Sequence, residues 1–101
     1  MTFRSRKLLD ADAGKPCVRC GCEDGTIVPA HYTGVRRNAF GGGLGIKVAD
    51  ILTARLCRKC HEWIDTLSRD KEDRWEHSEE FLTLIALTIV KRLEEGILVI
   101  A

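Results

Sequence analysis

The pattern of hydrophobic and polar positions predicts strands in two short segments of the chain. Residues 26–32 alternate with period two, which predicts a strand with Val28, Ala30 and Tyr32 on the face toward the core and His31 on the opposite face. Pro29 cannot donate a ladder hydrogen bond, so this strand is expected at a sheet edge or with a bulge. Residues 51–56 are predicted to be the returning strand of a hairpin.

Two further segments have the period of a helix. Residues 58–67 form the first, with Ile64 and Leu67 on its core side. Residues 78–95 form the second, which Ser78 is expected to cap and Gly96 to end. Its apolar positions form one wide face: Phe81, Leu82, Ile85, Ile89 and Leu93. The remaining segments are predicted to be two loops and a short final strand, over residues 33–47, 69–77 and 97–100.

Composition agrees with one small domain over residues 1–101. The hydrophobic fraction is 45% and the charged fraction is 31%, which are ordinary values for a globular protein. Residues 1–12 are predicted to be a basic arm or a short helix. No apolar run reaches the roughly 20 residues that cross a bilayer, and no apolar segment of a signal peptide follows the basic N-terminus. We therefore expect a cytoplasmic protein with reduced thiols and no membrane partner.

Four of the five cysteines form two C-x-x-C pairs, which are Cys17 with Cys20 and Cys57 with Cys60. In a small chain with reduced thiols, two such pairs predict one tetrahedral four-cysteine zinc site. Such a closed site holds the fold and has no open position for a substrate, so the zinc is expected to be structural. Cys22 is a spare thiol, either free or able to replace Cys20.

The 36 residues between the two pairs exceed the usual spacing, so a substantial insert must join them. A knuckle, a hairpin and a helix supplying the second pair would fill this insert. The predicted fold class is therefore α+β: a small zinc-bound treble clef, which residues 17–67 would form, with the helix over residues 78–95 packed behind it.

Charge is distributed unevenly along the chain. Residues 1–60 carry eleven Lys or Arg and five Asp or Glu, whereas residues 61–101 carry five and ten. A basic half is suited to a phosphate backbone, although such clusters are more often only solvated surface. Lys47 follows a glycine-rich stretch but lacks the Ser or Thr of a nucleotide-binding loop. Lys47, Arg36 and Arg37 are instead predicted to contact DNA phosphates.

Three residues beside the zinc pairs have side chains suited to hydrolytic chemistry. His61 follows Cys60 on the predicted helix, points about 100° away from it and shares a face with Asp65. His31 lies on the preceding strand, and the strand and helix can bring these three side chains around one cleft. The alternatives are that His31 is a hydrogen-bonded structural residue and that His61 is a fourth zinc ligand.

The order of these motifs resembles the HNH, or ββα-metal, nuclease superfamily. The motifs are C-x-x-C-G at 17–21, A-H-Y at 30–32, G-x-G-x-K-x-x-D at 43–50 and L-C-x-x-C-H-x-x-I-D at 56–65. More narrowly, they resemble the phage and prophage YbcO-like group, which is related to the recombination-enhancement nuclease Ref. The resemblance covers mainly residues 17–65.

The resemblance implies a metal-dependent DNA endonuclease that acts in phage or prophage recombination, with a recombinase as a possible partner. His31 matches the general base, and Asp50 lies near the central position that fixes the base or its loop. His61 and Asp65 match ligands of a catalytic Mg²⁺ or Mn²⁺ ion. Many members have an acidic ligand where this chain has Ala30, so Asp50 or Asp65 would supply that carboxylate.

Two other functions remain open from the residues alone. One is a non-catalytic zinc-stapled module that binds DNA and needs no second metal. The other is a zinc-stapled protein–protein adaptor, which would be indifferent to DNA even at low salt.

Overall fold

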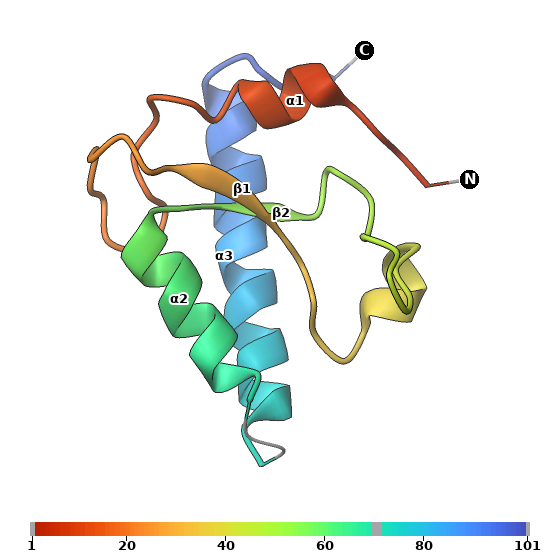
Figure 1. The fold of residues 1–101 in the computed structure, drawn as a ribbon. Coiled ribbons are helices and arrows are strands. Elements are labelled where there is room, and N and C mark those ends of the chain that lie inside the picture. Colours follow the sequence, from red (N-terminus) through yellow and green to blue (C-terminus); the bar gives the residue numbers. More distant parts are fainter. Residues whose placement is uncertain (1, 70–71, 101) are drawn as a thin grey trace.

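A two-stranded antiparallel sheet lies at the centre of the fold, with helices around it (Figure 1). The structure is a computed structural model that describes residues 2–69 and 72–100. The elements in chain order are α1 (Arg6–Asp10), β1 (Val28–His31), the 3₁₀ helix η1 (Arg37–Phe40), β2 (Thr53–Leu56), α2 (Arg58–Leu67) and α3 (Arg74–Glu94). Figure 1 shows α3 behind both strands, α2 descending from the end of β2 and α1 near the C-terminal end of α3. The described chain is thus α+β, as its periodicity predicts.

Pro29 has no backbone N–H to donate, and β1 tolerates it because its partner residue in β2 makes its own backbone hydrogen bonds elsewhere. The two strands pair with Pro29 opposite Arg55 and His31 opposite Thr53. The backbone N–H of Arg55 donates to Thr88 Oγ1 at 3.0 Å, and its carbonyl accepts from the Val18 amide at 2.9 Å. Both backbone groups of Arg55 therefore bond away from β1, so the missing N–H of proline leaves no orphan acceptor.

All four residues of β2 are buried, and Figure 1 shows α3 passing behind both strands. The core around it contains Tyr32, whose ring contacts Phe40 and Phe81 in edge-to-face geometry at centroid separations of 5.7 and 5.6 Å. Of the residues on the predicted core faces, Ala30, Tyr32 and Ile64 are buried and Leu67 is partly buried, whereas Val28 at the start of β1 is exposed. This core fixes the C-terminal end of β1, where His31 lies.

Helix α3 starts four residues earlier than the sequence predicts, at Arg74 instead of Ser78. Ser78 is not its cap, because it is buried in the second turn and its hydroxyl is hydrogen-bonded to Tyr32 Oη. His77 is buried beside it. Tertiary contacts therefore stabilise a charged first turn of the helix, where the sequence alone predicts a loop. The C-terminal end is as predicted, since Gly96 follows the helix with a positive φ of 74°.

The predicted strand over residues 97–100 is wrong. The amides of Ile97 and Leu98 instead donate to the Arg92 carbonyl at 2.9 and 3.1 Å, which closes the end of α3.

Residues 70 and 71 of the predicted loop over residues 69–77 lie outside the described residues. The helix over residues 58–67 and the hairpin are confirmed, although the strands are shorter than predicted. No described helix has the length and apolarity needed to cross a membrane.

A buried ionic cluster joins α1, β2 and α3. Asp12, which follows α1, accepts from Arg92 Nη2 at 2.6 Å and from Arg55 Nε at 3.2 Å, and all three side chains are buried. Glu95 pairs with the Arg55 guanidinium through both carboxylate oxygens, at 2.8 and 3.1 Å. Charged groups out of water require such partners. The cluster therefore fixes how the N-terminal segment lies on the sheet and α3.

Candidate functional site: a four-cysteine cluster and a His–Asp pair in a basic pocket

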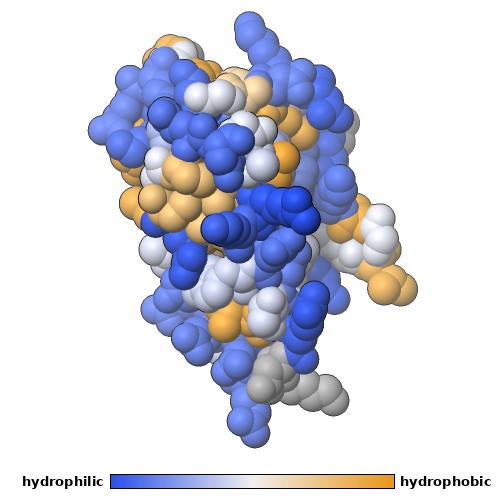
Figure 2. Space-filling model, turned by 60° about the vertical axis from the view of Figure 1, so that its left-hand side comes forward, coloured by the Kyte–Doolittle hydropathy of each residue, from blue (hydrophilic) through white to orange (hydrophobic). Residues whose placement is uncertain are grey.

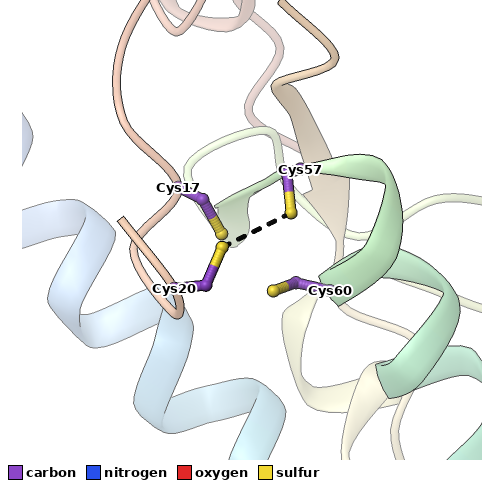
Figure 3. A group of neighbouring side chains, drawn as sticks. All are labelled: Cys17, Cys20, Cys57 and Cys60. Atoms are coloured by element: carbon purple, nitrogen blue, oxygen red, sulfur yellow. Dashed lines mark hydrogen bonds between the residues drawn. The ribbon is translucent and has the colours of Figure 1, made fainter. Parts of the chain in front are cut away.

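The two C-x-x-C pairs come together as the spacing predicts. The four Sγ atoms of Cys17, Cys20, Cys57 and Cys60 all lie within 4.8 Å of one another, and Figure 3 shows them converging on one centre. Cys20 Sγ and Cys57 Sγ are 3.6 Å apart. A tetrahedral zinc with Zn–S bonds of about 2.3 Å separates its sulfurs by about 3.8 Å. The cluster can therefore hold a metal ion such as zinc.

Local backbone geometry directs each pair toward this centre. The Gly21 amide donates to the Cys17 carbonyl at 2.9 Å, and Gly21 has a φ of +78°, so the first pair forms a tight knuckle. Cys57 is the N-cap of α2, which brings Cys60 onto the same side one turn later. The Arg19 guanidinium lies over the Trp63 ring at 3.6 Å and donates to Cys60 Sγ, so the knuckle also contacts α2 directly.

The thiols of Cys60 and Cys20 differ widely in pKa. Burial raises the pKa of Cys60 to about 12, whereas a hydrogen bond from the Cys22 backbone lowers the pKa of Cys20 to about 6. A bound divalent cation favours all four thiolates and so fits this donor set. Cys22 lies outside the four-cysteine group, but its sulfur is near Cys57 and Asp24.

A second group of polar side chains surrounds His31 at the end of β1. His31 Nε2 and Asp50 Oδ1 are 2.8 Å apart, and both side chains are largely buried. Asp50 also accepts from Arg4 Nη1 at 3.1 Å and from the Ser5 amide at 2.8 Å. Burial opposes the ionisation of Asp50, but the hydrogen bonds from His31, Ser5 and Arg4 outweigh it and lower the pKa to about 2.

An ionised Asp50 decides which nitrogen of His31 carries the proton. A carboxylate only accepts hydrogen bonds, so Nε2 must donate to Asp50. In the neutral imidazole, Nδ1 is then the basic nitrogen with a free lone pair. The geometry therefore leaves Nδ1 of His31 able to take a proton from water.

His31 lines two pockets that also contain basic side chains. One pocket of ≈ 370 Å³ is formed by Arg4, Arg6, Leu9, Lys47 and Asp50 together with His31. The other is lined by Arg37, Lys47 and the glycine-rich residues 43–46. Cationic side chains around a partly buried base form a site suited to an anionic substrate.

The structure brings only some of the predicted site residues to these pockets. Arg37 and Lys47 line a pocket with His31, whereas the Arg36 guanidinium lies 5.3 Å from the centroid of the Trp75 ring in a separate surface pocket. His61 and Asp65 face one another on α2 with Nε2 and Oδ2 3.7 Å apart, as their spacing predicts. Among the described residues, neither belongs to a group of three or more metal-ligand side chains within 4.8 Å, and neither lines the His31 pockets.

Arg4 and Arg6 are candidate site residues that the sequence does not reveal. The sequence shows a basic arm at residues 1–12, but not that Arg4 reaches a carboxylate 46 positions away. Arg4 also donates to the carbonyls of Val48 and Lys47, at 2.8 and 2.7 Å. The Asp50 amide donates to the Phe3 carbonyl at 3.0 Å. The arm is therefore bonded along the loop that supplies Asp50.

No family model, no curated protein and no solved structure matches this chain.

Proposed function

We propose that the chain is a metal-dependent DNA endonuclease of the HNH, or ββα-metal, kind, with His31 as its general base. The observation that carries this proposal is the hydrogen bond between His31 and an ionised Asp50 inside a basic pocket. A base needs a fixed tautomer, a free nitrogen and an anionic substrate held beside it. His31, Asp50 and the surrounding Arg4, Arg6 and Lys47 supply all three.

In this mechanism His31 Nδ1 takes a proton from a water molecule as its oxygen attacks the phosphorus of a phosphodiester. Asp50 stabilises the imidazolium that forms and keeps its ring in position. Arg37 and Lys47 bind the phosphate oxygens, on which negative charge accumulates. The P–O3′ bond then breaks and leaves a 5′-phosphate and a 3′-oxygen that takes up a proton.

His61 and Asp65 are the proposed protein ligands of a catalytic Mg²⁺ or Mn²⁺ ion. Two protein ligands suit Mg²⁺, because this ion usually keeps several waters and completes its shell with substrate phosphate oxygens. When bound, the ion supplies positive charge to the phosphate and to the leaving oxygen. The half-exposed position of both side chains leaves room for those other ligands.

The four-cysteine cluster is proposed to hold a structural zinc in a treble clef. The order of knuckle, β1, β2 and α2 supports this, because the second cysteine pair begins the helix that follows the hairpin. The resemblance in motifs further supports a phage or prophage nuclease of DNA recombination, with a recombinase as its partner.

A non-catalytic zinc-stapled DNA-binding module is the second candidate. It is favoured by one observation, that His61 and Asp65 lie outside the pockets that His31 lines. In such a module the pocket would bind phosphates, and the His31–Asp50 hydrogen bond would only fix the loop.

Cleavage assays with zinc-loaded protein distinguish the two candidates. Supercoiled plasmid and single-stranded DNA are incubated with wild type, His31→Ala and the surface control Asn38→Ala, with Mg²⁺, with Mn²⁺ and with neither. The endonuclease predicts metal-dependent cutting by wild type and Asn38→Ala that falls at least about 100-fold in His31→Ala. Zinc content and circular dichroism must be unchanged in the variant. Salt-sensitive DNA binding without cutting by any protein would reject the nuclease in favour of the module.

A further inference from the structure

The glycine-rich loop next to His31 ends in a tight turn with an apolar tip. The amides of Gly43 and Ile46 each donate to the carbonyl of the other, at 3.0 and 3.1 Å. Gly45 has a φ of +73°, a conformation that side chains rarely adopt. At the tip, Leu44 is 98% exposed and Ile46 is 60% exposed.

The base of this turn is held firmly to the rest of the protein. The Gly42 amide donates to the Arg37 carbonyl at 2.9 Å, and the Ala49 amide donates to the Phe40 carbonyl at 3.0 Å. A Cβ at Gly42 would lie 2.8 Å from the Val48 side chain, which shows how closely the base is packed. Leu44 is thus presented on a fixed support.

The turn projects from the body of the molecule beside the basic groups of the site. In Figure 1 the segment between β1 and β2 extends to the right of the sheet, and Figure 2 shows an apolar protrusion at that height on the right-hand edge. Leu44 lines the same pocket as His31, Arg37 and Lys47. One surface therefore combines an exposed apolar tip, two cations and the candidate base.

We propose that Leu44 is a wedge that enters between adjacent base pairs of duplex DNA when the phosphate backbone lies against Arg37 and Lys47. This rests on the proposed function, because it takes DNA as the partner. Proteins that kink DNA insert apolar side chains between base steps while cations hold the flanking phosphates. Partial unstacking bends the strand and exposes one phosphodiester to His31.

The cations beside Leu44 favour DNA as the partner over an uncharged apolar surface. A single exposed leucine does not by itself indicate a binding site, because exposed apolar residues are common on protein surfaces. Here Arg37 and Lys47, for which the described residues supply no ion-pair partner, line the same pocket as Leu44, so an apolar partner would cover two charges without a counter-charge. DNA offers both phosphates and an apolar base stack.

The test uses 2-aminopurine, whose fluorescence rises when its stacking is disturbed. Duplexes with the probe at successive positions are titrated with zinc-loaded His31→Ala protein without Mg²⁺ or Mn²⁺, so that the DNA stays uncut. The same background carries Leu44→Ser, the apolar replacement Leu44→Met, or the control Val99→Ser, whose site is 81% exposed and outside the loop.

The wedge predicts a rise in fluorescence at one base step with the parent, Leu44→Met and Val99→Ser proteins. Leu44→Ser should lose this rise and bind about tenfold more weakly. Equal affinity and equal fluorescence for Leu44→Ser and its parent would overturn the wedge, and cleavage by wild type would still support the nuclease. Absence of DNA binding by every protein at low salt, together with absence of cleavage, would overturn both proposals.

Discussion

His31 and Asp50 are 19 positions apart, and a hydrogen bond of 2.8 Å joins the imidazole to the carboxylate. The segment between them forms the glycine-rich loop, so this bond closes the loop at its base. The same carboxylate accepts from Arg4 and from the Ser5 amide. Asp50 is therefore the point at which the strand, the loop and the N-terminal arm meet.

The Asp50 charge should make a contribution to stability that disappears in acid. Its pKa of about 2 in the folded protein lies below its ordinary value of 3.8, so the unfolded chain takes up the proton first. Wild type should exceed Asp50→Asn by roughly 2 kcal/mol in free energy of unfolding above pH 4, and the difference should shrink as the pH falls toward 2. Urea unfolding of the two zinc-loaded proteins measures this from pH 7 downward, at each pH at which metal analysis still finds one zinc per chain. A difference that grows as the pH falls would contradict the assignment.

Removing one member of the buried ionic cluster should cost much more than removing an exposed charge. Asp12→Ala leaves the buried guanidinium of Arg92 without its carboxylate, so we expect a loss of about 3–5 kcal/mol in free energy of unfolding. Asp10→Ala removes an exposed ion pair with Arg6 and should cost less than about 1 kcal/mol. Chemical denaturation of the two variants makes the comparison. Equal losses would show that the buried cluster contributes no more than the surface pair.

Metal removal should unfold the protein, and the fifth cysteine should be dispensable. Structural zinc in small domains contributes about 10–16 kcal/mol of apparent binding free energy, which exceeds the stability of many small folds. We expect one zinc per chain in wild type and in Cys22→Ser, and loss of both metal and cooperative unfolding in Cys60→Ser. Metal analysis and thermal unfolding measure these properties. Loss of zinc from Cys22→Ser would instead make Cys22 a ligand.

Arg37 and Arg36 are neighbours in sequence but should differ in their effect on DNA binding. Arg37 and Lys47 line the pocket of His31, whereas Arg36 stacks near Trp75. Arg37→Ala and Lys47→Ala should each weaken binding and reduce the slope of log K against log salt by about 1. Arg36→Ala should change neither by more than about twofold. Fluorescence anisotropy at four or five salt concentrations determines the slopes; an equal effect of Arg36→Ala would place the DNA on a different face.

The parts of the fold that local sequence determines could be predicted. Helix α2 begins and ends where its pattern indicates, and the two cysteine pairs meet as their spacing requires. The start of α3 could not be read in this way, because His77 and Ser78 are polar residues that become helical through burial against the core. The apolar pattern of residues 97–100 predicts a strand, but the first two amides of this segment donate to the Arg92 carbonyl at the end of α3.

In the candidate site, too, local geometry could be predicted from the sequence, whereas contacts between distant segments could not. The i, i+4 relation of His61 and Asp65 follows from helical geometry and is confirmed by their 3.7 Å separation. The Arg4–Asp50 pair depends on a contact between residues 46 positions apart, which no local pattern encodes. Period-two alternation gives the face on which His31 lies, but not the pocket that this face lines. The sequence therefore singles out His31 and Asp50, which a hydrogen bond joins in the structure, but not the arm that contacts them.

The ion pair between Asp12 and Arg92 has a consequence for synthesis on the ribosome. All four cysteines of the cluster have been translated once residue 60 is complete, so the nascent chain can capture a metal early. The carboxylate of Asp12 must wait for Arg92, 80 residues after it, before it can be buried with its partner. The emerging chain can therefore bind a metal at the cysteine cluster first, and it completes its buried ionic cluster only when the last turns of α3 leave the exit tunnel.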